Sequence, residues 1–506
     1  MTNSITTYTR ENGGRVILLF LLFLLAIYQL ATAGLPAFAL ICLIPIVILF
    51  VYFIFRWKML AFWMLVFINY FIQMKGFPLP SIPMSLPCEM LQLLLLAIAI
   101  IDARQTPNFE RCGNLMFFSL IIWCGYCTLE ILNDTCGLGI NFGAWYTGAR
   151  LMAFQLLYIF LVFSLYISTP EILIRYLRVW ALLALFSAIW TMKQQYVGLA
   201  AIESAFLYGT GSTTHLLQGG TLIRYWSTFS DAATYGCNAA ATAVAFVVFG
   251  STMKLFADKI LFLSVSVIVI LGMFASGTRT AIVCVFAGLA VYVILSKSIR
   301  IAIPSAIIGA IMFFILAFTN IGQGIQQIRR MRSAFDKKDA SANTRAINQA
   351  TMRKYMNEAP WGIGLGMGPQ NVPANNKYNR MATIPPDSEY VFIWLRTGIF
   401  GITTFLITTA IMFLGACHIV FFKLKNKSLI GIGAGFCGAF TAIQLAGYGN
   451  QVLMQFPNTL IFYGGLSTVY LLPIMEPEWN KYEAKQLAKQ EERKRLKLEK
   501  KLAKRV

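Results

Sequence analysis

Apolar residues in this chain occur in long runs, and shorter polar segments separate these runs. Most runs reach about 15 residues or more, a length that a lipid bilayer requires and a soluble core does not. Hydropathy predicts about fourteen membrane spans, at 16–33, 36–55, 59–73, 88–101, 114–132, 150–168, 177–198, 232–252, 259–275, 281–296, 301–319, 388–415, 428–447 and 458–475. We therefore expect an all-α polytopic integral membrane protein with about 12–14 transmembrane helices.

One polar segment is much longer than the others and divides the chain. We expect a transmembrane bundle over 1–319, which includes an outward loop at 199–231, and a long extracytoplasmic loop over 320–387. C-terminal transmembrane helices follow over 388–475, and a basic cytoplasmic tail covers 476–506. The long loop is expected to contain two short helices, at 322–335 and 343–358, before a run of alternating glycines at 362–368.

Lysine and arginine in the short connections indicate how the bundle is oriented. They precede the first predicted span and follow the even-numbered ones, as at Arg56, Arg104, Arg175, Lys254 and Lys423. Short cytoplasmic loops carry an excess of these residues, so both chain ends are expected to be cytoplasmic. The opposite, outward face then receives segments 74–87, 133–149, 199–231, 276–280 and 320–387.

Composition excludes several other classes of protein. The chain is 58% hydrophobic and only 12% charged, whereas a soluble domain carries about 25% charged residues. The net charge of +21 includes a tail after Asn480 with 11 basic and 4 acidic residues. A basic tail beside a last span is typical of a topology signal and a contact with anionic lipid, so no nucleic-acid partner is expected.

Cysteine and histidine usage indicates no metal centre. The ten cysteines are scattered without a paired metal-ligand spacing, and the chain has only two histidines, His215 and His418. We expect neither a bound metal nor a cofactor. The long loop is instead rich in arginine and lysine, which suits either an anionic ligand such as a phosphate or a solvated basic face. Arg345, Gln349 and Arg353 recur at helical spacing and would share one face.

Three segments together resemble one known family. They are APWGIGLGMG followed by DSEYVFIWLRTGIFGITTFL in the long loop and the next span, FASGTRTAIVCVFAGLAVYVI before 295, and IRYWSTFSDAATYGCNAA before 241. Their order, spacing and common outward placement are similar to those of the O-antigen ligase and polymerase superfamily of bacterial surface-polysaccharide enzymes. The resemblance covers roughly residues 180–475.

This resemblance implies a reaction. The family transfers a glycan from an undecaprenyl-diphosphate-linked donor to an acceptor hydroxyl on the outer face of the cytoplasmic (inner) membrane. We expect a metal-independent membrane glycosyltransferase that polymerises lipid-linked repeat units into surface polysaccharide, such as O-antigen, capsule or exopolysaccharide. A ligase that uses lipid A-core or another acceptor is the alternative. A flippase for lipid-linked oligosaccharides is more distant, because the polar residues gather in one long loop and not across many spans.

The resemblance maps two arginines of this chain onto the family's diphosphate-contacting positions. These are Arg279, at the outer end of a span, and Arg224, before the span that starts near Asp231. An arginine can stabilise the negative charge of a leaving diphosphate. The alternatives from the residues alone are snorkelling of Arg279 to lipid head groups and pairing of Arg224 with Asp231.

Asp387 is the expected acceptor base or orienting group. Relatives commonly carry a histidine at this position, so a mechanism that depends on histidine is not expected here. A carboxylate can accept the proton of an acceptor hydroxyl, although Asp387 also fits a helix N-cap. His215, in an outward loop, is either a substitute for the absent histidine or a solvated loop residue.

Six further residues are predicted substrate contacts, each with a structural alternative. Glu389 lies in a first helical turn, where it would complement the helix dipole. Arg396 lies two turns inside a span and must find a partner there, either in an ion pair or in the site. The remaining four candidates are Arg150, Tyr225, Arg345 and Arg353.

Overall fold

A computed structural model describes residues 56–76, 85–101, 109–217, 222–297 and 340–503, with scattered residues in 13–53 and 303–329. The chain divides into two units, Met1–Met64 and Leu65–Val506, and the second unit holds every feature discussed below. The predicted spans at 36–55 and 301–319 and the loop helix at 322–335 fall largely outside the described residues, and the span at 16–33 is described in part, as helix.

The described part is almost entirely helical. In the first half of the chain the helices are α3 Lys58–Phe71, α4 Leu86–Ile101, η2 Phe109–Cys112, α5 Leu115–Leu129, η3 Glu130–Leu132, α6 Phe142–Ala149, η4 Arg150–Phe154, α7 Gln155–Tyr166, α8 Pro170–Met192, η5 Lys193–Val197, α9 Ala201–Tyr208 and α10 Ser212–His215. A two-residue antiparallel pair follows, β1 Leu216–Leu217 with β2 Leu222–Ile223, in the register Leu216 to Ile223.

The remaining helices form the larger part of the bundle. They are α11 Ala232–Thr252, α12 Phe256–Ala275, α13 Arg279–Leu295, α16 Ala340–Met356, α17 Asn379–Thr383, α18 Glu389–His418, η7 Ile419–Lys423, α19 Lys427–Gly449, η8 Thr459–Tyr463 and α20 Gly464–Ala503. The segments η4, η5, η7 and η8 are π-helical and continuous with their neighbours. The loop helix expected at 343–358 is present as α16.

Membrane-spanning character is confirmed by helix length and hydropathy. Eight helices in the described part are long and apolar enough to cross a bilayer: Leu115–Leu132, Phe142–Tyr166, Pro170–Val197, Ala232–Thr252, Phe256–Ala275, Glu389–Lys423, Lys427–Gly449 and Thr459–Leu496. The shorter apolar helices α3, α4 and α13 coincide with three more predicted spans. The protein is an all-α polytopic membrane protein, as predicted.

Polar residues fix where several helices begin. Asn114 accepts hydrogen bonds from the backbone N–H groups of Met116 and Phe117 at the start of α5. Thr169, followed by Pro170, caps α8, and Asn426 caps α19. Each cap satisfies N–H groups that the first helical turn leaves without partners. The sequence thus specifies both the apolar spans and their starting points.

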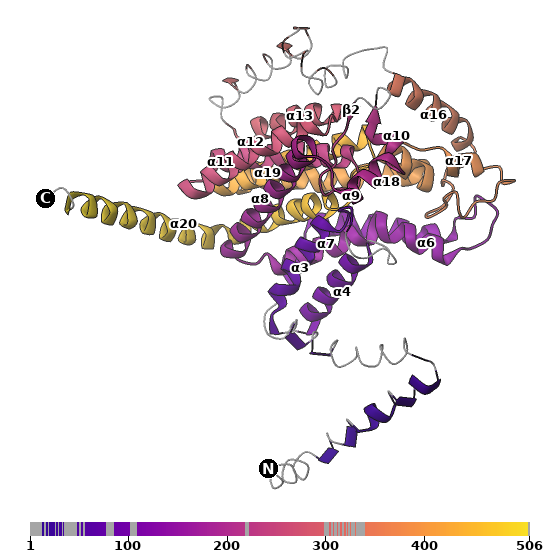
Figure 1. Ribbon diagram of the computed structural model, residues 1–506, viewed down its shortest axis with the longest axis horizontal. Coiled ribbons are helices and arrows are strands. Elements are labelled where there is room, and N and C mark those ends of the chain that lie inside the picture. The colour runs from indigo at the N-terminus through magenta and orange to yellow at the C-terminus, as the bar shows by residue number, and fades with distance from the viewer. Residues whose placement is uncertain are drawn as a thin grey trace. The chain divides into compact units, whose positions relative to one another are not determined.

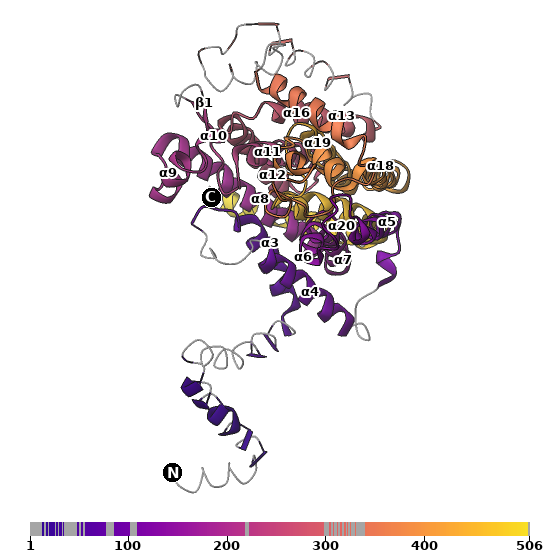
Figure 2. The ribbon, with the colours of Figure 1, turned by 90° about the vertical axis from the view of Figure 1, so that its right-hand side faces the viewer.

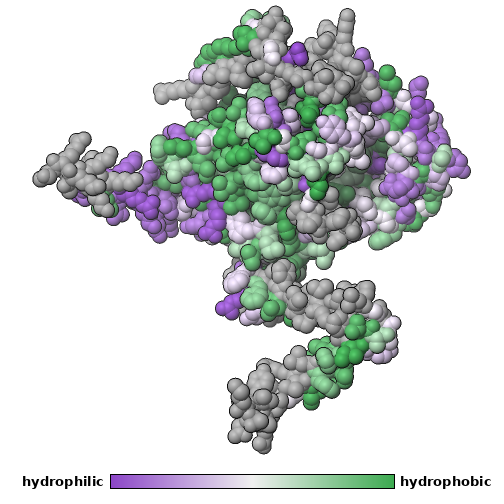
Figure 3. All heavy atoms as spheres, in the orientation of Figure 1, coloured by the Kyte–Doolittle hydropathy of each residue, from purple (hydrophilic) through white to green (hydrophobic). Residues whose placement is uncertain are grey.

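Helix α11 lies at the centre of the second unit. It packs against α12, α13 and α19 (Figures 1 and 2), and it is the most completely buried of the eight candidate spans. In the view of Figure 3, hydrophobic residues cover the middle of this unit, and hydrophilic residues gather near α17 and along the distal part of α20. The N-terminal end of α18, at Glu389, and its continuation at Lys423 define the two ends of the bundle, called here the Asp387 end and the Lys423 end.

Candidate functional site

Arg224 is held against the turn that precedes α13. Its Nη2 donates to Thr278 Oγ1 at 3.2 Å, and its Nε donates to the Ser276 carbonyl at 3.4 Å. Its Nη1 reaches the Thr214 carbonyl at 3.2 Å. Because Thr278 Oγ1 also donates to the Ala232 carbonyl in α11 at 2.8 Å, the guanidinium is fixed between the starts of two central helices.

Arg279 lies directly beside this turn, as the first residue of α13, and is half-buried. The next residue, Thr280, accepts a hydrogen bond from Asn450 Nδ2 at 3.2 Å. Asn450 begins the loop 450–458 between α19 and η8. The structure therefore brings both predicted arginines to one turn, and it connects that turn to loop 450–458.

Asp387 precedes α18 in an unusual backbone conformation. Its φ of +54° lies in the left-handed region, which aspartate tolerates better than most residues but still at some cost. Ser388, not Asp387, is the N-cap residue, and its hydroxyl donates to the Gly447 carbonyl at 3.1 Å. The Asp387 carboxylate is half-buried and has no hydrogen bond to any residue in the described part of the chain. The capping alternative is thus not realised.

Glu389 ties α18 to loop 450–458. Its side chain is only 3% exposed, and its Oε2 accepts a hydrogen bond from the backbone N–H of Leu453 at 3.0 Å. A buried carboxylate that accepts a backbone hydrogen bond is held in place by it. This geometry favours an anchoring role over direct substrate contact, and it links Asp387 to the loop that Asn450 joins to α13.

Helix α18 is interrupted at Gly398, whose φ is +66°. The carbonyls of Leu395 and Arg396 accept hydrogen bonds from Ile363 and Gly364 at 2.9 and 3.1 Å. The Ile399 N–H donates to the Pro360 carbonyl at 2.9 Å. The glycine run of the long loop therefore supplies partners for backbone groups that the interruption releases, which a helix inside a membrane requires.

The same run also packs against α6. Gly366 has a φ of +72°, and a Cβ built there would lie 1.8 Å from the Ala144 carbonyl oxygen. A run of glycines can allow a ligand to approach the backbone closely. The structure instead shows close approach to the backbones of α6 and α18.

Arg396 is buried and has no ionic partner among the described residues. Its residue surface is 8% exposed, and its Nε and Nη1 have no hydrogen-bond partner in the described part of the chain. The guanidinium carbon lies 5.3 Å from the centre of the Phe392 ring. The ion pair that the sequence allowed for Arg396 is not formed with any described carboxylate, and its role as a substrate contact stays a prediction.

Arg150, by contrast, has a carboxylate partner. Its Nη1 lies 3.1 Å from Glu89 Oε2, and its Nη2 donates to Ser85 Oγ at 3.0 Å. Both charged side chains are buried. Burying a charge costs free energy that a partner of opposite charge offsets, so this contact offers a structural reason for Arg150. Its predicted role in ligand binding stays a prediction.

The loop arginines are placed on α16. The apolar face of this helix, including Met352 and Met356, packs with Ile363 and Leu395 in one cluster. Arg353 points away from this cluster and is exposed. Arg345 belongs to the same helix, and Tyr225, next to Arg224, is half-buried.

His215 is buried and structural. Its Nε2 accepts from the Ala232 N–H at 3.3 Å, so its Nδ1 is the protonated nitrogen and donates to the Gly211 carbonyl at 3.1 Å. Its ring packs edge-on against Phe206 and Trp226. Burial lowers the pKa of His215 to about 4. This neutral, engaged ring does not fit the role of a substitute base.

Two contributors to this end of the bundle escaped the sequence analysis. Loop 450–458 joins α11, α13 and α18, since Asn458 also bonds to Asn238 at 2.7 Å. Lys75 donates to the Ser230 carbonyl at 3.1 Å and lies 3.9 Å from the Phe206 ring centre. The asparagines of loop 450–458 were the available signal, because amides between two apolar spans need hydrogen-bond partners when they are buried.

In a comparison with known protein families, residues 264–406 match the family model described as O-antigen ligase. This match supports the resemblance to the O-antigen ligase and polymerase superfamily that the sequence motifs indicated. The O-antigen ligase segment contains Arg279, Asp387 and Arg396, whereas Arg224 lies before it. The match supports a membrane glycosyltransferase of the O-antigen ligase or polymerase type and does not distinguish the two. A search of curated proteins found no match.

Proposed function

We propose that the protein polymerises undecaprenyl-diphosphate-linked repeat units into surface polysaccharide at the Asp387 end of the bundle. The observation that carries this proposal is the connection of three groups. Arg224 and Arg279 meet at the turn 276–278, and hydrogen bonds through Asn450 and Leu453 join that turn to the start of α18 beside Asp387. Two cations and one unbonded carboxylate are the groups that this reaction requires.

The arginines would stabilise the leaving group. In the transfer, the acceptor hydroxyl oxygen bonds to the anomeric carbon of the donor, and the bond from that carbon to the lipid diphosphate breaks. Negative charge develops on the departing diphosphate. Arginines that neighbouring hydrogen bonds already hold in position stabilise such charge with little reorganisation.

Asp387 would receive the proton of the acceptor hydroxyl. Its carboxylate is free of hydrogen bonds to the described residues, and strained backbone conformations cluster at functional sites. His215 is unsuited to the task, because it is buried, and both its ring nitrogens are occupied. A carboxylate where relatives commonly have histidine favours the polymerase over the ligase that uses lipid A-core.

The experiment that tests this function is the glycan profile of a strain without the gene. A polymerase predicts the loss of chain length, with single repeat units still transferred to their final acceptor. Full-length chains that stay on the lipid carrier would indicate a ligase instead. Accumulation of single lipid-linked units on the inner face would indicate a flippase.

Complementation with single variants tests the assignment of the arginines. Arg224→Ala and Arg279→Ala should fail to restore long chains although the protein is present at normal levels. Arg175→Ala, which removes an exposed arginine near the start of α8, is the matched control and should restore them. A normal glycan ladder from both Arg224→Ala and Arg279→Ala would contradict the diphosphate assignment.

A further inference from the structure

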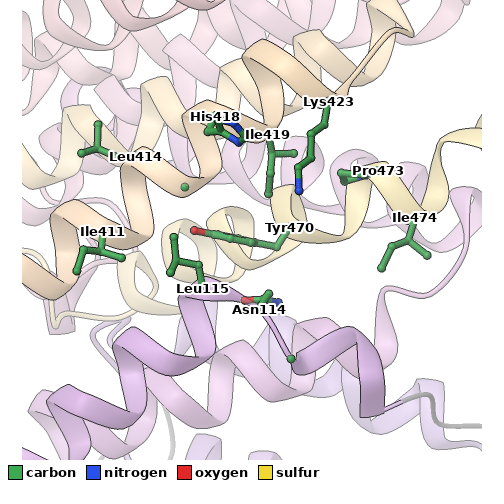
Figure 4. A pocket seen from close by; sticks show the side chains of 12 residues that line it. Asn114, Leu115, Ile411, Leu414, His418, Ile419, Lys423, Tyr470, Pro473 and Ile474 are labelled. Carbon is green, nitrogen blue, oxygen red and sulfur yellow. The ribbon is translucent and has the colours of Figure 1, made fainter.

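A cavity lies between α5, α18 and α20, toward the Lys423 end of the bundle. Its volume is about 690 Å³, within the range of roughly 300–1,000 Å³ that is common for ligand sites. Figure 4 shows its lining, which comes from the start of α5, the last two turns of α18 with η7, and the first three turns of α20. The lining residues are Gly113, Asn114, Leu115, Ile411, Leu414, Gly415, His418, Ile419, Lys423, Tyr470, Pro473 and Ile474.

Irregular helical geometry accounts for this space. Helix α18 continues into the π-helix η7, which has a wider turn than an α-helix. Opposite it, α20 contains Pro473, which removes a backbone hydrogen bond and disfavours close helical packing at that point. The two helices are held together nearby, because the Tyr470 hydroxyl donates to the Met412 carbonyl at 2.6 Å. The cavity is therefore a built feature of the two helices.

The cavity is apolar along most of its lining and cationic at one end. Lys423 is exposed, and its ammonium makes no ion pair or hydrogen bond to any described residue. In Figure 4 this ammonium points into the space between α18 and α20. No acidic residue belongs to the lining. Glu476, further along α20, accepts hydrogen bonds at its Oε1 from the backbone N–H groups of Lys425 and Asn426.

We propose that this cavity binds an anionic phospholipid. An acyl chain would lie against Leu115, Ile411, Leu414 and Ile474, and the phosphate would meet Lys423. Charge complementarity supports this occupant, since the Lys423 ammonium has no partner among the described residues and stands where an apolar cavity reaches the polar end of a membrane helix. Asn114 is unavailable as a head-group ligand, because it caps α5 with its Oδ1 and donates its Nδ2 to the Arg111 carbonyl.

This site is distinct from the proposed catalytic site. After the interruption at Gly398, the helical segment continues without a break from Ile399 to Lys423, which corresponds to about 35 Å along a helix axis. A phosphate at Lys423 thus lies at the opposite end of the bundle from Arg279. For this reason the proposed occupant is a membrane phospholipid and not the lipid-diphosphate donor, and the proposal does not depend on the proposed reaction.

Lipid competition on the purified full-length protein tests the proposal. The protein is reconstituted in vesicles with equimolar phosphatidylglycerol and phosphatidylcholine of matched chains, and retained lipid is identified by native mass spectrometry. The wild type should retain phosphatidylglycerol with a preference of about 5-fold, the effect of one basic residue at an anionic membrane surface. Lys423→Gln should abolish this preference. Lys425→Gln, an exposed lysine outside the cavity, should preserve it.

A second variant pair tests the apolar part. Leu414→Trp places bulk at the cavity and should reduce retention of both lipids, whereas Ile407→Trp, on the same helix but outside the lining, should not. Equal retention of the two lipids by the wild type would overturn the proposal. So would a preference that survives in Lys423→Gln, or retention of a polyprenyl phosphate in place of phospholipid when it is added to the same vesicles.

Discussion

Asp387 combines a strained backbone conformation with a carboxylate that makes no hydrogen bond to the described residues. If the carboxylate is the acceptor base, Asp387→Asn should lower the transfer rate by about 10²–10⁴-fold, the usual contribution of general base catalysis. Asparagine tolerates the left-handed region as well as aspartate does, so the thermal stability should not change. Transfer with purified lipid-linked donor, and unfolding in detergent, measure the two effects. Full activity of Asp387→Asn would remove this residue from the chemistry.

His215 should make stability depend on pH. Burial lowers its pKa to about 4, below the value of about 6.5 for an unfolded histidine. Between these values the unfolded chain binds the proton and the folded chain does not, so folding stability falls as the pH decreases from 6.5 toward 4. Three charged groups also act on this pKa: Arg224 and Lys75 lower it, and Asp231 raises it.

The matched variant for this prediction is His215→Gln. Glutamine can still accept the hydrogen bond of Ala232 through its carbonyl, but it does not titrate. The unfolding temperature of the wild type should therefore decrease more than that of His215→Gln between pH 6.5 and pH 4.5. Parallel curves for the two proteins would show that His215 is not the titrating group.

Individual arginines show where sequence analysis reaches its limit. Arg150 and Arg396 look alike in the sequence, since each is a single cation in or beside an apolar run. The structure separates them, because Glu89 lies against Arg150 and no described carboxylate lies against Arg396. Partners distant in the chain decide such cases, and a local pattern does not contain them.

At the scale of elements, the contact between the glycine run and α6 gives a sharp prediction. Gly366 and Gly139 have nearly the same φ, +72° and +74°, but a Cβ meets the Ala144 carbonyl at the first and no atom within 4 Å at the second. Both alanine variants incur the left-handed backbone cost, about 1–2 kcal/mol. Only Gly366→Ala adds a clash, worth about 1–3 kcal/mol more.

Thermal unfolding of the two variants in the same detergent measures this difference. Gly366→Ala should unfold at a clearly lower temperature than Gly139→Ala, which serves as the control for backbone strain alone. Equal losses of stability in the two variants would mean that the glycine run does not pack against α6 as described.

Hydropathy predicted the membrane helices well because it is a local property. Eleven predicted spans coincide with helices in the described part of the chain. The interruption at Gly398 was not predicted, since its freed carbonyls are satisfied by Ile363 and Gly364 from a different segment. The role of loop 450–458 was not predicted for the same reason, because its hydrogen bonds go to Thr280, Glu389 and Asn238, which are distant in the chain. The charged residues of the candidate site stay predictions, and the loop that joins them was not predictable from a local pattern.

At the scale of the whole molecule, the last helix fastens the Lys423 end of the bundle. The sequence suggested that a basic tail starts at 476, but α20 continues without a break to Ala503. Glu483 is only 5% exposed. Its carboxylate accepts hydrogen bonds from Lys254 Nζ at 2.6 Å, Ser428 Oγ at 2.5 Å and Asn426 Nδ2 at 3.0 Å. One side chain of α20 thereby joins the segment before α12 to the start of α19.

Removal of this carboxylate should therefore destabilise the whole bundle. Glu483→Ala leaves buried donors without an acceptor, at a cost of about 1–3 kcal/mol, whereas Glu491→Ala, an exposed glutamate of the same helix, should have little effect. A chain that ends after Leu487 keeps Glu483 and should unfold like the wild type, and one that ends after Pro477 should resemble or exceed Glu483→Ala in its loss. Unfolding temperatures in one detergent compare all four variants. If the chain ending after Leu487 were as unstable as the one ending after Pro477, the distal basic residues, and not the contacts of Glu483, would stabilise this end of the molecule.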